Sequence, residues 1–329
     1  MRALALIALL LAAQPAQPAT WERWQHVTGI VDVVGPRSDG QLVAVAAGRL
    51  LLVARDGTTT PFAQGPDGFA GSPDAEPYLV ITPDLPVDSA GCSFAHDELY
   101  LLDLTSLPGI ARVDPAGHAS RFASIPEAET LGGIALDTTG RFGHRLLVTG
   151  TRQGRTVVAA IDCQGGVTRL TDSAPPVEGG LAVAPDSFGP FGGDLIAPDE
   201  NSGQLWAIGP DGAARLVLKP DLPVGGDTGI ESVGFVPPGF SAGAGGFAYL
   251  ADRATPNNPF PGSDSILRLS AQALAAAGVQ DGDLLVATEG GGTTVAIQCR
   301  DICTARTVAI GPAGGNVGHI EGRITLTAP

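Results

Sequence analysis

The sequence predicts an all-β fold: a six-bladed β-propeller with four-stranded antiparallel blades. Three observations predict it. Of the 329 residues, 46 are glycine and 27 are proline, and only 16% are charged, which is typical of a globular protein with many short strands and turns. Similar apolar segments recur about every 50 residues. Each repeat holds three or four short apolar runs separated by turn signals, as propeller blades do.

Six segments carry the repeat, and each is a short apolar strand closed by a turn signal. The spacing between the last two is nearly twice the others, so about six units fit the chain. Five or seven blades are alternatives, because residues 280–320 are less regular. A β-sandwich or a β-helix would not explain this period. The segments are TGIVDVVG from Thr28, EPYLVITP from Glu76, LGGIALDT from Leu131, EGGLAVAP from Glu178, ESVGFVPP from Glu231 and EGRITLTA from Glu321.

Within a repeat, the first strand leads through a glycine or proline turn into the second and third strands. ESVGFVPP is followed by GFAYLAD (residues 246–252) and SILRLS (residues 265–270), and we expect all three in the fifth blade. The one helix that we expect, over residues 270–279, is an insertion beside that blade. Stacked blades bury their apolar faces, and ring closure protects the sheet edges. EGRITLTAP at the C-terminus is predicted to be the innermost strand that closes the ring.

The N-terminus has the layout of a secretory signal peptide. A basic residue, Arg2, precedes an apolar run from Ala3 to Ala13 and then small residues and prolines. We therefore predict a signal peptide over residues 1–19 and a single propeller domain over residues 20–329. The apolar run is too short to span a membrane. The mature protein is expected to be an exported monomer, secreted or periplasmic, without membrane insertion.

Four cysteines suit an oxidising compartment, where an even number of cysteines can pair. Cys299 and Cys303 flank a tight turn and are predicted to form one disulfide, which leaves Cys92 and Cys163 for the other. The alternative is a zinc site. It is disfavoured because only one close pair of cysteines exists and no histidine is near it in the sequence.

The net charge of −15 excludes several classes of partner. Nucleic acids and anionic membranes require clustered positive charge. Lys219 is the only lysine, which argues against a Schiff-base mechanism. The acidity is consistent with simple solubility or with affinity for cations. The expected partner is a small-molecule substrate or, alternatively, a protein, peptide or glycan.

Four of the six first strands begin with a glutamate: Glu76, Glu178, Glu231 and Glu321. First strands line the central axis of a propeller, so these carboxylates are expected to converge at one end of it. Clustered negative charges repel one another unless a cation lies between them. Carboxylate oxygens are ligands of Ca²⁺, so the sequence predicts a Ca²⁺ site, or a site for another divalent cation. The alternative is that some of these glutamates form ion pairs with arginines and the others are solvated.

Four further residues are candidates for the same site. Asp252 and Arg253 end a second strand, where Asp252 is a candidate base and Arg253 a candidate substrate ligand. His144 is a candidate auxiliary acid, and His319 is a candidate substrate ligand close to Glu321. The sequence GFSAG (residues 239–243) matches a nucleophile elbow, but strands lie on both sides of it, and an elbow requires a following helix.

EGGLAVAP at Glu178 and LGGIALD at Leu131 resemble strand openings of the six-bladed gluconolactonases, senescence marker proteins and strictosidine synthases. The layout is also similar to the wider NHL and TolB-like propellers. The resemblance implies a divalent ion on the axis, held by a glutamate at a first-strand entrance and by Asn and Asp residues. It also implies that the metal polarises a lactone carbonyl while a carboxylate acts as base.

Two functions therefore follow from the sequence. The first is an exported, cation-dependent hydrolase of a small lactone, ester or sugar-derived substrate. The second is a non-catalytic propeller that binds a protein, peptide or glycan on one rim. A quinone-dependent dehydrogenase is a weaker third alternative, because the chain has only 3 Trp and 3 Tyr.

Overall fold

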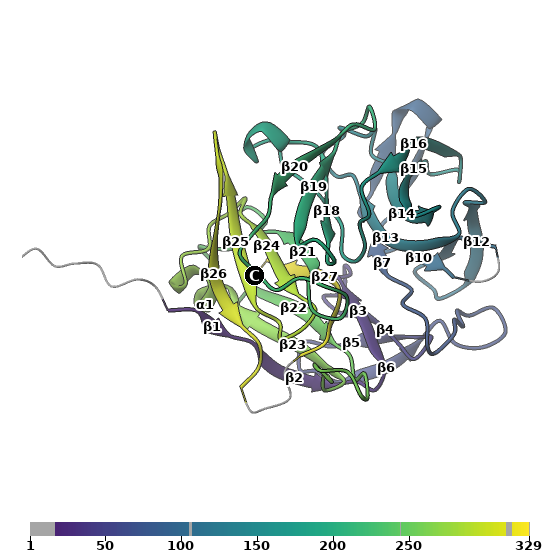
Figure 1. The fold of residues 1–329 in the computed structure, drawn as a ribbon. Helices are drawn as coiled ribbons and strands as arrows, with labels where there is room; N and C mark the ends of the chain where they lie inside the picture. Colours follow the sequence, from purple (N-terminus) through teal and green to yellow (C-terminus); the bar gives the residue numbers. More distant parts are fainter. Residues whose placement is uncertain (1–16, 105–106, 244, 314–317, 329) are drawn as a thin grey trace, which may run out of the picture.

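A computed structural model describes residues 17–104, 107–243, 245–313 and 318–328. Six antiparallel four-stranded sheets surround a central axis (Figure 1), which confirms the predicted all-β, six-bladed propeller. Listed from the innermost to the outermost strand, blade 1 is β3 (Ile30–Val34), β4 (Leu42–Ala46), β5 (Arg49–Val53) and β6 (Thr59–Phe62), and blade 2 is β7 (Leu79–Ile81), β10 (Leu99–Asp103), β11 (Gly109–Val113) and β12 (Ala119–Ser124). Blade 3 is β13 (Thr130–Leu136), β14 (Leu146–Arg152), β15 (Arg155–Ile161) and β16 (Val167–Ala174), and blade 4 is β17 (Ala182–Val183), β18 (Leu195–Asp199), β19 (Gln204–Ile208) and β20 (Ala214–Leu218). Blade 5 is β21 (Ile230–Phe235), β24 (Leu284–Thr288), β25 (Thr294–Cys299) and β26 (Cys303–Ile310), and blade 6 is β27 (Ile320–Thr327), β22 (Phe247–Asp252), β23 (Ser265–Ser270) and β2 (Glu22–His26).

Blade 6 closes the ring with strands from three parts of the chain. Its innermost strand is the C-terminal β27, as the sequence predicted, and its outermost strand is the N-terminal β2. A short strand, β1 (Ala19–Thr20), pairs in parallel with β26 at the edge of blade 5. The N-terminal segment therefore runs along the outer edges of two blades (Figure 1). The predicted signal peptide lies mostly outside the described residues, and its last residue, Ala19, belongs to β1.

One expected strand pairing is wrong. GFAYLAD and SILRLS form β22 and β23, which pair with each other in blade 6; β22 also pairs with β27, and neither strand pairs with β21. The chain then returns through the helix α1 (Ala271–Ala276) to blade 5, where β24 pairs with β21. The apolar pattern of a strand specifies which faces are buried but not which neighbour it pairs with. Order along the chain therefore suggested the wrong blade.

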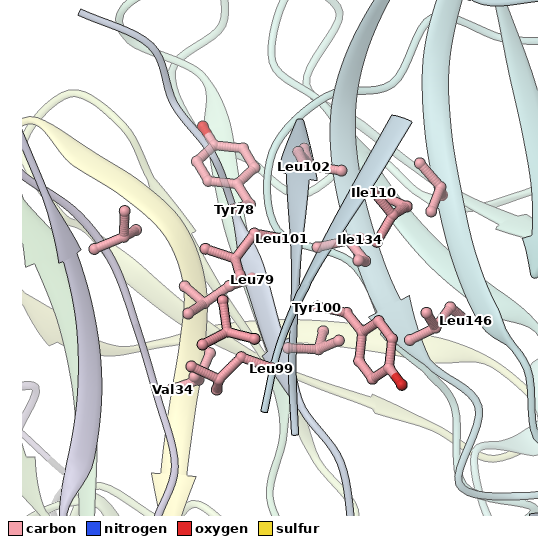
Figure 2. Packing of buried hydrophobic residues seen from close by; sticks show 14 of the residues in the cluster. Val34, Tyr78, Leu79, Leu99, Tyr100, Leu101, Leu102, Ile110, Ile134 and Leu146 are labelled. Carbon is pink, nitrogen blue, oxygen red and sulfur yellow. The ribbon is translucent and has the colours of Figure 1, made fainter. Parts of the chain in front are cut away.

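Apolar side chains of neighbouring blades pack against one another. The cluster between blades 1 to 3 includes the fully or nearly fully buried Val34, Leu79, Leu101 and Ile134 (Figure 2). The ring of Tyr78 lies at the edge of this cluster, and its hydroxyl points away from the other labelled side chains. Packing therefore fixes this tyrosine while leaving its polar atom for the axis.

Both predicted disulfides are confirmed. Cys92–Cys163 joins blade 2 to blade 3, and Cys299–Cys303 joins the ends of β25 and β26. Cys92 belongs to a hairpin inserted in blade 2, formed by β8 (Leu85–Val87) and β9 (Cys92–Phe94). Among the described residues, no helix is long and apolar enough to cross a membrane.

A buried aspartate, Asp32 of β3, links three innermost strands. Its carboxylate accepts backbone N–H groups of Val33 at 2.8 Å, Leu79 of β7 at 3.1 Å and Arg323 of β27 at 3.2 Å. Burial raises the pKa of Asp32 to about 7, although these hydrogen bonds and the charge of Arg323 oppose the shift. Asp32 therefore holds the ring-closing strand against blades 1 and 2.

The contact of Asp32 with β27 predicts a sharp difference between two glycine substitutions. Gly322 has a φ of +68°, and a Cβ there would collide with the side chain of Asp32, whereas Gly154, with a φ of +73°, has no atom within 4 Å of such a Cβ. We expect Gly322→Ala to lower the free energy of unfolding by about 3 kcal/mol and Gly154→Ala by about 1 kcal/mol. Urea denaturation of both variants measures this, and equal losses would contradict the role of Asp32.

Candidate functional site

Seven carboxylates line a cavity of about 410 Å³ at the end of the axis where the innermost strands begin. We call this cavity the acidic mouth. Tyr78, Gly226, Arg253, Thr255 and His319 complete its lining. Among these residues, Arg253 is the one with a permanent positive charge. The carboxylates are those of Glu76, Glu178, Glu200, Asp227, Glu231, Glu289 and Glu321.

All four glutamates that the sequence placed at first-strand entrances line the acidic mouth. Glu76 and Glu178 precede β7 and β17, while Glu231 and Glu321 lie in β21 and β27. Glu231 and Glu321 are each only 3% exposed. Glu178 is exposed at the rim, and Glu76 forms an ion pair with Arg253. The four carboxylates therefore share one site at different depths.

A β-bulge aims Glu231 at the axis. Ile230 of β21 pairs with Thr288 of β24, and Ser232 pairs with the adjacent Ala287. Glu231 between them has no partner in β24 and is therefore the extra residue of the bulge. Comparable register shifts occur in β3, β13 and β27. Bulges increase local twist and redirect side chains next to functional sites. The bulge therefore turns a buried strand residue into a residue of the mouth.

Tyr78 bridges the two deepest carboxylates. Its Oη lies 3.0 Å from Glu231 Oε1 and 2.8 Å from Glu321 Oε2. One hydroxyl proton can serve only one of these oxygens at a time, so the other contact needs a proton on the carboxyl group. Burial raises the pKa of Glu231 well above its usual value, and the charges of Glu321 and Glu289 raise it further. Glu231 therefore readily supplies that proton.

A second group of ligands lies beside this pair. His319 Nε2 is 3.2 Å from Glu289 Oε1 and 3.3 Å from Glu321 Oε1. One ligand atom each of Asp227, Glu289 and His319 lies within 4.8 Å of the other two. Glu289 Oε2 is buried and meets no N–H or O–H donor among the described residues, while the carboxyl groups of Glu289 and Glu200 are close enough to share a proton. A buried carboxylate oxygen without a donor is costly unless a proton or a cation neutralises it.

Burial and mutual repulsion raise the pKa of most carboxyl groups in the mouth. The pKa of Glu289 is raised to about 9 by burial, then by the charge of Glu321 and by Glu200. The pKa of Glu76 is raised to about 7 by burial and Glu321, against the opposing charge of Arg253. The pKa values of Glu178 and Glu200 are also raised, chiefly by partial desolvation of their carboxyl groups in the mouth, even though Glu178 as a whole residue is exposed. The mouth is therefore deficient in positive charge at neutral pH.

The structure places the four other candidate residues in different environments. Arg253 and His319 line the acidic mouth, whereas Asp252 and His144 do not. Asp252 is fully buried, and its carboxylate accepts the backbone N–H of His319 at 2.8 Å and the hydroxyl of Ser263. It therefore positions His319. His144 lies in the turn between β13 and β14, with Nδ1 3.3 Å from the carbonyl oxygen of Asp137.

Sequence reasoning did not place Glu200, Asp227, Glu289 or Tyr78 at the axis. Glu200 and Glu289 each follow the second strand of a blade directly, in the similar segments DLIAPDE and DLLVATE, and Arg253 occupies the same position after β22. A second strand runs antiparallel to the first, so its end lies beside the start of the first strand. Aligning the ends of the second strands would have revealed these residues.

Together, the fold and the site define a six-bladed propeller with an acidic, partly buried axial site. No family model matches this chain, and no curated protein matches its sequence. The chain is similar in structure to a calcium-binding protein, regucalcin, from Agrobacterium tumefaciens, with 10% identity over 92% of this chain and 81% of that chain and a TM-score of 0.51.

It is also similar to virginiamycin B lyase from Staphylococcus aureus, with 12% identity over 85% of this chain and 84% of that one and a TM-score of 0.45. A gluconolactonase from Xanthomonas campestris matches with 13% identity over 71% of this chain and 69% of that one, at a TM-score of 0.43. At these identities the similarity concerns the fold alone. The fold-level resemblance predicted from the sequence is confirmed.

The raised pKa values predict that stability falls with rising pH when no divalent cation is present. Asp32 and Glu289, with pKa values of about 7 and about 9 when folded, keep protons that the unfolded chain releases near pH 4. Their contribution is fully present below about pH 4 and is lost as pH rises through the folded values. At about 1.4 kcal/mol per pH unit, these two groups set an upper limit of about 8 kcal/mol on the loss of unfolding free energy in chelator between pH 5 and pH 9, and we expect a loss of at least about 3 kcal/mol.

Urea denaturation in chelator at pH 5, 7 and 9 measures this slope. Glu289→Gln removes one of the titrating groups, so its slope between pH 7 and pH 9 should be shallower than that of the unaltered protein. Stability that is constant or rises from pH 5 to pH 9 would show that the mouth does not retain these protons.

Proposed function

We propose that the acidic mouth binds one divalent cation, with Ca²⁺ as the expected ion, and that the protein is a cation-dependent hydrolase. The proposed substrate is a small lactone, ester or sugar-derived molecule. The observation that carries the proposal is the buried Oε2 of Glu289, which meets no hydrogen-bond donor among the described residues, in a cavity with seven carboxylates and one arginine. A cation would neutralise this oxygen and the neighbouring charges together. The two disulfides support a place of action outside the cytoplasm.

The donors around Glu289 fit a hard cation. Ca²⁺ takes six to eight oxygen ligands, mainly from carboxylates, carbonyls and water. Asp227, Glu289 and His319 would hold the ion, and Glu321 is near enough to His319 to contribute an oxygen. This set differs from the four first-strand glutamates expected from the sequence. Among those, Glu76 is paired with Arg253, and Glu178 lies at the exposed rim.

When bound, the cation would polarise the carbonyl group of the substrate and stabilise the negative charge that develops on its oxygen. The protein's own groups supply the other requirements. Glu76, with a pKa of about 7, can accept a proton from the attacking water at neutral pH. Arg253 lies at the same mouth and can orient a polar group of the substrate. Tyr78 holds Glu231 and Glu321 in place beneath them.

Metal analysis, calorimetric titration with Ca²⁺ and a lactone and ester hydrolysis panel test this proposal. We expect one tightly bound ion, a higher melting temperature with Ca²⁺ than with chelator, and cation-dependent hydrolysis. Glu289→Gln should weaken Ca²⁺ binding at least tenfold, about 1.4 kcal/mol, and reduce hydrolysis at least as much. Glu127→Gln makes the same change at an exposed ion pair with Arg169 and should alter neither property.

Two other results have clear meanings. Ca²⁺ binding without hydrolysis of any substrate in the panel would favour the non-catalytic binding propeller. If Ca²⁺ neither binds nor stabilises the protein, the cation-dependent hydrolase is refuted.

A further inference from the structure

The opposite end of the axis holds a second cavity with very different chemistry. It measures about 370 Å³ and is lined by residues from all six blades, so it lies where the innermost strands end. We call it the apolar cavity. Most of its lining is aliphatic, aromatic or proline. The strand-end residues among that lining are Val34, Ile81, Leu136, Val183, Phe235 and Leu326.

Arg323 is the one charged residue that lines the apolar cavity. Its guanidinium has no hydrogen bond or ion pair with any residue that the structure describes, and its Nε is buried. The nearest opposing charge is Asp32, but both oxygens of that carboxylate already accept backbone N–H groups. Burial lowers the pKa of Arg323, and Asp32 only partly offsets the effect. Arg323 is partly exposed where it lines the cavity, with Nε buried, so its guanidinium is a cation without a direct partner among the described residues.

Such a group attracts an anion. Arginine stays protonated in proteins and offers a planar set of donors that matches a carboxylate. Burial of an unpaired charge is unfavourable, and a bound carboxylate would remove that cost. Arg323 is the single cation here and Asp32 is nearby, so one negative charge fits better than two.

The walls determine the remainder of the ligand. Thr325 and Thr139 line the cavity, but their hydroxyls already donate to the carbonyl oxygen of Val33 and to Asp137, respectively. The exposed Thr138 is the one lining threonine whose hydroxyl has no such partner among the described residues, so the cavity offers few free side-chain donors for a sugar. Its size is typical of a small-molecule site, and its aliphatic and proline surface favours a hydrocarbon body.

We propose that the apolar cavity binds a small monocarboxylate with an apolar body, such as a medium-chain fatty acid, with its carboxylate on Arg323. This site is separate from the acidic mouth and does not depend on the hydrolase proposal. The ligand's hydrocarbon part packs on the ends of the innermost strands. The two ends of the axis therefore bind groups of opposite charge.

Calorimetric titration of the full protein with octanoate in chelator tests the proposal, because chelator removes any metal to which a carboxylate could bind. We expect one saturable site and at least tenfold weaker binding of the neutral isostere octanamide. Arg323→Gln should weaken octanoate binding at least tenfold, whereas Arg169→Gln, an exposed arginine on blade 3, should not change it.

Arg323 lies in the ring-closing strand, so loss of binding by Arg323→Gln could also come from loss of folding. A second variant therefore alters the cavity at a different residue. Thr138→Trp changes an exposed residue that lines the apolar cavity and keeps Arg323. It should weaken octanoate binding by obstructing the cavity. No octanoate binding, equal binding of octanamide, or unchanged binding by either Arg323→Gln or Thr138→Trp would overturn the proposal.

Discussion

Pairing of the C-terminal strand β27 with β22 is the interaction on which this structure depends, because it closes the ring. Closure brings β27 between β21 and β3 and buries the apolar faces of the blades on either side. It also brings the N–H of Arg323 to the carboxylate of Asp32. The same strand carries Glu321 to the acidic mouth and Arg323 to the apolar cavity. Without closure, neither end of the axis would be complete.

The two ends differ because the innermost strands all run in the same direction. Their starts bring carboxylates together, and their ends bring aliphatic side chains and prolines together. Burial of like charges in the mouth is unfavourable for folding, and such strain is common at functional sites. The apolar packing between blades and two disulfides offset it. The protein therefore concentrates its unfavourable electrostatics where a ligand can relieve them.

Blades 5 and 6 are interlocked by the path of the chain. After β21 the chain builds β22 and β23 of the next blade, and only then returns through α1 to β24. Blade 6 is completed only after blade 5, because its innermost strand β27 follows β26 in the chain, and it also needs β2 from the N-terminus. Asp227 precedes β21, Glu289 follows β24 and His319 precedes β27, so the candidate cation site needs both blade 5 and blade 6.

The sequence alone determined the blade repeat, the four glutamates at first-strand entrances, the closing strand and both disulfides, since periodicity, turn residues and cysteine spacing are local properties. It did not determine which blade β22 joins, because alternating apolar residues define buried faces and not partners. Only the tertiary structure placed Glu200 and Glu289 beside Glu231 and left the guanidinium of Arg323 without a partner among the residues that it describes. The charge state of a carboxyl or guanidinium group depends on burial and on distant neighbours, and these exist only once the ring is closed.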